Sequence, residues 1–202
     1  MTIKKGSDYG VNAPLPEDAP VASSDAELRD FVLSLQSINS PQPTVGLVGG
    51  DLCKTLGGSG DVNRLFTTDA LNVPVDLVIA SIDGVDFPFV AHLIVGKPFC
   101  PGFVAMMNAQ WLGPLDFGPR SHPGDGLVDI TSGSLKWRER RIARSRARTG
   151  THLPHPSLSH KRTNVETLLF ERPAPICIDG ALKVRGRSIS IRVEPDAFHV
   201  VV

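Results

Sequence analysis

The chain changes character near Asn72–Pro74, and this change constrains its fold more than any other feature. From that point on, apolar segments alternate with turn residues, and only one stretch has helical character. The clearest two segments, VDLVIASI and VDFPFVAHLIV, are joined by Asp83-Gly84, a dipeptide favoured in tight hairpins. Many strands with a single helix predict a sandwich-like or barrel-like β lobe over residues 74–202.

The other elements of this lobe are expected where apolar runs lie between turn residues. Strands are predicted at 103–109, 127–131, 163–170, 175–178, 187–193 and 197–202, with one helix at about 134–148.

The first 73 residues predict a smaller α/β part. Residues 1–22 contain three prolines and are expected to form an extended arm. Ser24-Asp25-Ala26-Glu27 has the form of a capping box, and apolar residues at helical spacing predict a helix from Asp25 to Ile38. A short strand at 44–48 and a glycine turn follow, so residues 23–73 correspond to a fragment of an α/β layer. The expected fold class is therefore α+β.

Composition sets wide bounds on function. A hydrophobic content of 41% with 21% charged residues suits a globular protein with a packed core. The formal net charge of zero gives no general attraction to nucleic acid, so no nucleic-acid partner is expected. No apolar run approaches the roughly 18–20 residues that span a bilayer, and the first residues lack a secretory signal. We therefore expect a cytoplasmic protein with three reduced cysteines.

Four motifs in the second part follow one another in a fixed order. Their sequences are MMN leading to PRSHPGDGLVDI (106–130), GTHLPHP (150–156), IDGA (178–181) and PDAFHV (195–200). This order and spacing resemble the β-rich lobe of the diacylglycerol kinase and sphingosine kinase-like lipid kinases, in their bacterial form. The resemblance implies a β-rich lobe paired with an α/β nucleotide lobe, and ATP-dependent phosphorylation of a lipid.

The resemblance also assigns candidate site residues. Asp179 matches the aspartate that acts as general base in the family, although the glutamate two positions later is an alanine here. Asp179-Gly180 also suits an ordinary hairpin turn. Gly49, Gly50 and Asp51 match part of the family's second glycine-rich nucleotide motif, and the resemblance makes them candidates for nucleotide or phosphate binding. In the family's first motif, glycines let backbone N–H groups bind phosphate. Too few residues precede this motif for the family's first phosphate-binding motif, so we expect a truncated nucleotide lobe.

Asp125 lies in the loop where relatives hold a structural divalent cation. Its carboxylate, with the backbone carbonyls of His122 and Leu127, would offer the oxygen ligands that Mg²⁺ prefers. The alternative is a plain Pro-Gly-Asp-Gly turn. Mg²⁺ is the one cofactor that the sequence suggests, and its presence stays open at this point.

The run from Lys136 to Arg148 carries seven cations and one anion in a neutral chain. A basic helix with a tryptophan suits the surface of an anionic membrane, where the protein would sit peripherally. The alternatives are an ordinary solvated helix face and a nucleic-acid contact. The predicted surface consists of Trp137, Arg138, Arg140, Arg141, Arg144, Arg146 and Arg148.

Together these features favour a non-catalytic protein that binds a lipid-like or nucleotide-like ligand or a partner. The incomplete phosphate-binding motifs and the alanine after Asp179-Gly180 argue against catalysis. One alternative is an active lipid kinase that completes its ATP site with another chain, for instance in a homo-oligomer. The other is a purely structural interaction module.

Overall fold

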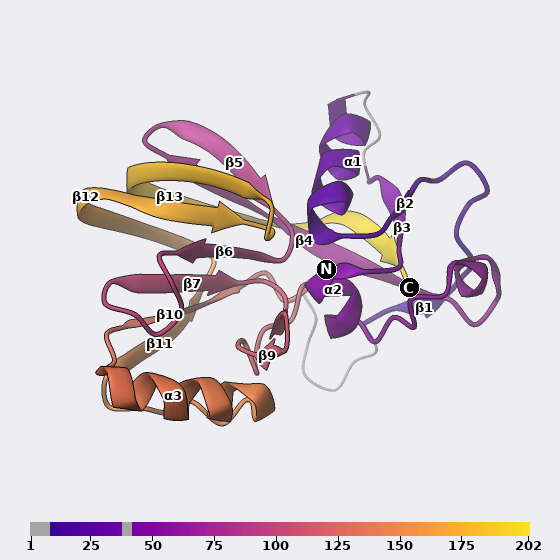
Figure 1. The fold of residues 1–202 in the computed structure, drawn as a ribbon. Coiled ribbons are helices and arrows are strands. Elements are labelled where there is room, and N and C mark those ends of the chain that lie inside the picture. The colour runs from indigo at the N-terminus through magenta and orange to yellow at the C-terminus, as the bar shows by residue number, and fades with distance from the viewer. Residues whose placement is uncertain (1–8, 38–41) are drawn as a thin grey trace.

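A computed structural model describes residues 9–37 and 42–202 of the chain. Within these residues one curled eleven-stranded sheet dominates, and the helices pack against it (Figure 1). The α+β, β-rich class that the sequence predicts is confirmed. The strands are β1 (Val11–Asn12), β2 (Val21–Ala22), β3 (Thr44–Leu47), β4 (Leu71–Ile82), β5 (Val85–Phe89), β6 (His92–Val95), β7 (Phe103–Met107), β8 (Trp111–Leu112), β9 (Leu115–Asp116), β10 (Val128–Gly133), β11 (Leu158–Thr163), β12 (Val165–Ile178) and β13 (Leu182–Val201).

The main path of the sheet runs β1-β4-β13-β12-β6-β7-β10-β11, and β8 forms a separate hairpin with β9. The pairs along this path are antiparallel, whereas β3 lies parallel to both β2 and β13. The only parallel pairs in the described sheet thus belong to the α/β part of the chain. Residues 9–22 of the predicted arm contain β1 and β2, and residues 1–8 lie outside the described part.

Three α-helices accompany the sheet, with two short 3-10 segments, Val62–Phe66 and Ala147–Thr149. Helix α1 (Asp25–Ser37) begins where the capping box predicts. Its Glu27 N–H donates to Ser24 Oγ at 3.3 Å, and the Glu27 carboxylate accepts the N–H of Ser23 at 2.8 Å. The predicted last residue, Ile38, lies outside the described residues. Helices α2 (Gly50–Thr55) and α3 (Trp137–Arg146) are shorter than α1.

The predicted hairpin at Asp83-Gly84 is confirmed. Both residues have positive φ, 49° and 88°, as a two-residue hairpin turn requires, and Ile82 pairs with Val85. Glycine tolerates this backbone conformation, and aspartate is among the few other residues that do.

Strands β12 and β13 are longer than the sequence predicts. The proline-containing stretches that suggested breaks lie at two bulges, between Leu169 and Ala174 and between Glu194 and Phe198, where the pairing register shifts. A bulge leaves backbone N–H groups outside the ladder, so proline is tolerated there. The chain therefore continues as one strand where two were expected. Strand β11 was not predicted.

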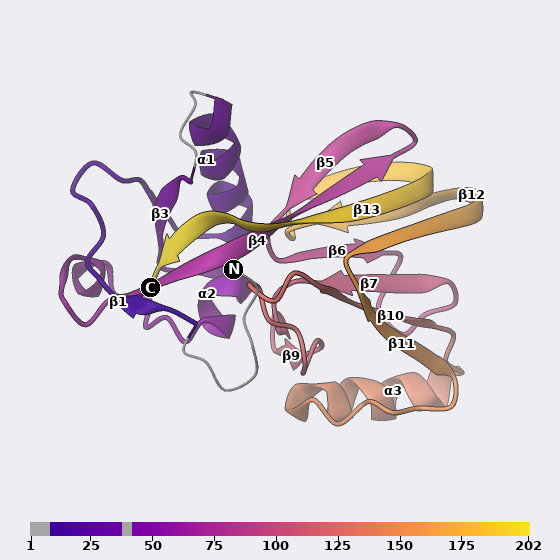
Figure 2. The same cartoon turned by 180° about the vertical axis from the view of Figure 1, so that it is seen from behind.

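Two strands, β4 and β13, run through both parts of the molecule (Figure 2). At one end they form a core with α1, α2 and β3, to which Leu28, Val45 and Phe198 each contribute a fully buried side chain. Further along they line the inside of the curled sheet. The boundary expected at residues 73–74 falls within β4.

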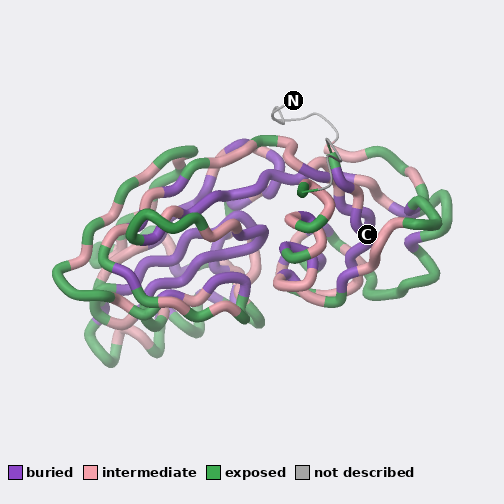
Figure 3. The backbone as a smooth tube through the Cα atoms, turned by 90° about the horizontal axis from the view of Figure 1, so that it is seen from above, coloured by how far each residue is buried: buried purple, intermediate pink, exposed green. Residues whose placement is uncertain are grey.

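A third apolar cluster lies on the outer face of the sheet, under α3. Ala143 and Ala147 face the aromatic residues Phe99, Phe103 and Phe117. Figure 3 shows the buried residues concentrated along the sheet strands and the helix faces that cover them. Helix α3 therefore presents its other face outward.

Candidate functional site

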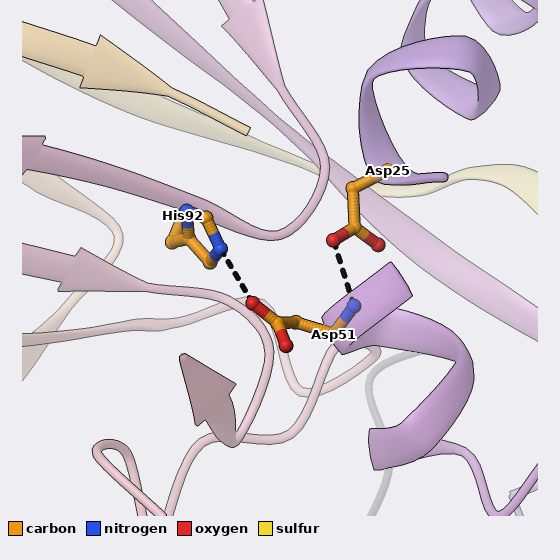
Figure 4. A group of neighbouring side chains, drawn as sticks. All are labelled: Asp25, Asp51 and His92. Carbon is orange, nitrogen blue, oxygen red and sulfur yellow. Dashed lines mark hydrogen bonds and ion pairs between the residues drawn. The ribbon is translucent and has the colours of Figure 1, made fainter. Parts of the chain in front are cut away.

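The candidate site lies where α1 and α2 meet the curled sheet (Figure 4). Gly49 has an extended backbone and precedes α2, and Gly50 has a φ of +96°, so the two residues turn the chain from β3 into α2. The first N–H groups of α2 point toward Asp25 of α1. Its Oδ2 accepts the N–H of Asp51 at 2.8 Å, and its Oδ1 accepts the N–H of Leu52 at 3.0 Å.

This arrangement places a carboxylate of the chain itself at the backbone donors predicted to bind phosphate. Orphan N–H groups at the start of a helix attract anions, and here Asp25 already satisfies two of them. Burial raises the pKa of Asp25, while the two N–H groups favour its charged form. Two backbone N–H groups at the predicted phosphate-binding segment therefore already donate to an anion of the chain itself, the Asp25 carboxylate.

Asp51 connects α2 to the β-rich part. The Oδ2 atom of its carboxylate lies 2.9 Å from Nε2 of His92 on β6. The N–H of Gly113 donates to both carboxylate oxygens, Oδ1 at 2.9 Å and Oδ2 at 3.0 Å. Burial raises the pKa of Asp51, but the bonds from His92 and Gly113 outweigh it and lower the net pKa. For His92 burial acts in the other direction and lowers the pKa. Its hydrogen bond to Asp51 and the charges of nearby carboxylates outweigh burial, so the net pKa of His92 is raised. These opposite shifts favour an imidazolium–carboxylate pair.

Asp179 lies in the turn between β12 and β13, and its side chain has no exposed surface. Its carboxylate accepts the N–H groups of Val90, Ala91 and His92 at 3.2, 2.9 and 3.1 Å. The guanidinium of Arg29 on α1 lies 3.7 Å away. Burial raises the pKa of Asp179 to about 6. The residue predicted as general base thus holds a loop and a helix in place.

Asp25, Asp51 and His92 bring three ligand-type atoms within 4.8 Å of one another. Each carboxylate oxygen already accepts an N–H bond, and one of them also contacts His92. The cluster is therefore a hydrogen-bond network that joins α1, α2 and β6. Its four carboxylate oxygens are all bonded, whereas Nδ1 of His92 has no hydrogen-bond partner among the described residues.

The loop around Asp125, predicted as a cation site, is paired with a cationic side chain of a neighbouring strand. Asp125 forms an ion pair with Arg162 of β11 and accepts the N–H of Leu127 at 3.0 Å. The carbonyl of His122, a predicted ligand, accepts the N–H of Asp125 at 3.3 Å. Arg162 also lies 3.3 Å from the buried Asp129. A divalent cation at Asp125 would have to compete with this guanidinium, and the Mg²⁺ site stays a prediction.

The basic residues of α3 divide into two groups. Arg140 faces the protein, where its Nε donates to the carbonyl of Leu135 at 2.8 Å. The outward face carries Trp137, 64% exposed, and Ile142, 56% exposed. Five arginines, four of α3 and one of the 3-10 segment that follows it, are exposed with them and form no ion pair within the described part of the chain. They are Arg138, Arg141, Arg144, Arg146 and Arg148.

The sequence did not identify Asp25, Arg29 and His92 as site residues. Asp25 and Arg29 belong to an amphipathic helix, where charged residues are ordinary, and His92 interrupts an apolar strand. Only His92 offered a signal, because a single histidine in an apolar run needs a buried partner.

Comparisons with known proteins bear on the fold. No protein-family model and no curated protein sequence matches this chain. Three solved structures, all assigned as diacylglycerol kinases of Bacillus anthracis str. Sterne, are similar to it. Their TM-scores are 0.68, 0.65 and 0.59, each at 14% sequence identity. The matches cover 90% of this chain and 76%, 76% and 74% of those chains. The chain therefore has a diacylglycerol kinase-like fold, as its four motifs predict. Fold alone does not decide function.

None of the described helices is long and apolar enough to cross a bilayer.

Proposed function

We propose that this chain is a non-catalytic protein of the lipid kinase fold that attaches to anionic lipid surfaces through helix α3. The observation that carries the non-catalytic part is the Asp25 carboxylate at the N–H groups of Asp51 and Leu52. A nucleotide phosphate at the same donors would meet a buried like charge. Nucleotide binding, one of the ligand classes that the sequence left open, is therefore the weaker candidate.

The environment of Asp179 supports the same conclusion. A general base must reach the proton that it removes, at about 2.6–3.2 Å or through one water. The Asp179 carboxylate has no exposed surface, and three backbone N–H groups already bind it. A lipid hydroxyl would reach it only if the loop at residues 90–92 moved away.

Lipid attachment is supported by the outward face of α3. Its exposed arginines share the outward surface with Trp137 and Ile142, so this surface carries both charged and apolar groups. Tryptophan favours the membrane–water interface, and each cation near an anionic leaflet contributes about 1 kcal/mol to binding. The helix is held on the sheet by buried alanines and by Arg140, which leaves this face available.

Wild-type protein is expected to transfer no radiolabel from ATP·Mg²⁺ to diacylglycerol in mixed micelles, because its phosphate donors and its base are both occupied. A known bacterial diacylglycerol kinase in the same assay serves as positive control. Transfer by the wild type that disappears in the Asp179→Asn variant would contradict the non-catalytic proposal and favour an active lipid kinase.

The triple variant Arg138→Gln, Arg141→Gln, Arg144→Gln is expected to bind vesicles about 100-fold more weakly than the wild type. Three lost cations correspond to about 3 kcal/mol, and 1.4 kcal/mol is a factor of ten in affinity. The measurement is co-sedimentation with phosphatidylcholine vesicles that contain 30% phosphatidylserine, at 50 and 150 mM salt.

Wild-type binding should weaken at the higher salt, because exposed charges are screened over about 8–10 Å. Pure phosphatidylcholine vesicles are the control for charge, and the melting temperature of the variant should match that of the wild type. Wild-type protein that ignores acidic vesicles even at 50 mM salt would end the membrane proposal.

A further inference from the structure

A groove on the β-rich part is lined by none of the candidate-site residues and by none of the arginines of α3. It has a volume of about 480 Å³, within the range of about 300–1,000 Å³ that is typical of small-molecule sites. Strands β12 and β13 form it together with the turn that follows β6. The groove is lined by Gly96, Lys97, Pro175, Ile176, Cys177, Lys183, Val184 and Arg185.

The position of the groove in the sheet explains why apolar surface is present there. Cys177 pairs with Ile94 on one side and with Lys183 on the other, and directly opposed residues lie on the same face of a sheet. On this outer face Ile94 is buried in the cluster under α3, which Ala143 completes. Cys177 is half-buried and belongs to none of the apolar clusters. The outer face that α3 covers therefore continues, uncovered, across β12 and β13.

The turn after β6 keeps this continuation open. Gly96 has a φ of +70° and no side chain, and its N–H donates to the carbonyl of Pro175 at 2.8 Å. This hydrogen bond holds the backbone at Gly96 against β12, and the chain then turns into the loop before β7. The apolar lining beside it comes from Pro175 and Cys177, since the side chains of Ile176 and Val184 pack into the cluster on the inner face of the sheet.

The charges around the groove all have the same sign. Three of its lining residues are cations, and none of the carboxylates in residues 9–37 and 42–202 lines it. The side chains of Lys97 and Lys183 make no hydrogen bond or ion pair to the described residues. Arg185 donates only to the carbonyl of Pro173, at 2.8 Å. Apolar lining with three uncompensated cations complements a ligand that has an apolar chain and an anionic head.

We propose that this groove binds a single-chain amphiphile with an anionic headgroup, its chain on Pro175 and Cys177 and its head near Lys97, Lys183 and Arg185. This site is separate from the vesicle-binding face of α3. A carboxylate and a phosphate head share the required chemistry, and the two are distinguished by experiment.

Cys177 provides a direct probe of the groove. In a Cys100→Ser background the only other cysteine is the buried Cys53, so a maleimide should label Cys177 first. Dodecanoate and dodecyl phosphate, each below its micellar concentration, are expected to slow labelling at least fivefold and saturably. Stronger protection by one of the two identifies the preferred headgroup. Dodecyltrimethylammonium, with the same chain and a positive head, should leave the rate within twofold.

The variant Lys97→Gln, Lys183→Gln, Arg185→Gln should need at least tenfold more of the protecting amphiphile. The triple α3 variant is the matched control, since it removes three arginines elsewhere and should keep full protection. The groove variant should in turn keep its binding to acidic vesicles, so failure of one proposal leaves the other testable.

Three results would overturn the groove proposal. The first is labelling unaffected by both anionic amphiphiles. The second is equal protection by the cationic one, and the third is protection that persists in the groove variant. The substituted side chains are exposed, so the variant should keep the wild-type melting temperature, which is measured alongside.

Discussion

Replacing Asp179 with alanine is expected to lower the free energy of unfolding by about 3–5 kcal/mol, as when one partner of a buried charged network is removed. The substitution leaves the N–H groups of Val90, Ala91 and His92 buried without an acceptor. It also leaves Arg29, whose side chain is only 10% exposed, without this carboxylate. Urea denaturation at pH 5 and at pH 8 measures the effect.

The pH dependence of this loss has a defined sign. The pKa of Asp179 rises from 3.8 to about 6 on burial, so the folded chain binds this proton more tightly than the unfolded chain does. Its contribution to stability is present below about pH 4 and is lost as the pH rises through about 6. The difference between wild type and Asp179→Ala should therefore be larger at pH 5 than at pH 8.

Asp86→Ala is the matched control for this substitution. Asp86 also pairs with an arginine, Arg192 at 3.3 Å, but both side chains are about half exposed. Such surface pairs contribute about 0–1 kcal/mol. If Asp179→Ala were no more harmful than Asp86→Ala, the Asp179 carboxylate would not be a structural anchor, and the case against catalysis would lose one of its two supports.

Gly50→Ala is expected to destabilise the protein by about 2–5 kcal/mol. The φ of +96° costs an alanine about 1–2 kcal/mol, and a Cβ at this position would overlap the Asp25 carboxylate. Displacing Asp25 breaks its bonds to the N–H groups of Asp51 and Leu52, which adds about 1–3 kcal/mol for a buried group left unsatisfied.

Gly57→Ala separates the two causes. Gly57 has a similar φ of +78°, but a Cβ there would have no heavy atom within 4 Å, so only the backbone cost of about 1–2 kcal/mol applies. The excess of Gly50→Ala over Gly57→Ala in urea denaturation therefore reports the Asp25 contact. Equal losses would show that Asp25 does not occupy the start of α2 in solution.

The sequence predicted local features and the overall fold well. The start of α1 follows from its capping box, and the hairpin at Asp83-Gly84 follows from its turn residues. Strand β11 was missed because its sequence, LSHKRT, is largely polar and shows no apolar alternation. The lengths of β12 and β13 were missed because a bulge that accommodates proline depends on the partner strand, which a local pattern does not contain.

The candidate site was predictable only in part. Asp51 and Asp179 could be selected by resemblance. The residues that contact them in the folded chain, Asp25, Arg29 and His92, are ordinary in their local sequence. Asp179 is far from Val90 in sequence, and only the folded sheet brings its carboxylate to that loop. Whether a candidate base is exposed or saturated is a property of such distant contacts, so the motif alone could not decide it.

The pairing of β3 with β13 also has a consequence for how the chain is made. Thr44 and Val45 pair with His199 and Val200, so the first core contains residues from opposite ends of the described chain. At about 5–20 residues per second, a ribosome needs about 8–30 s to add the roughly 150 residues between them. Throughout that interval the nascent α1 and β3 lack the strand that buries them. Residues synthesised early are thus among the last to be covered, and they are the natural targets of chaperones that act on the emerging chain.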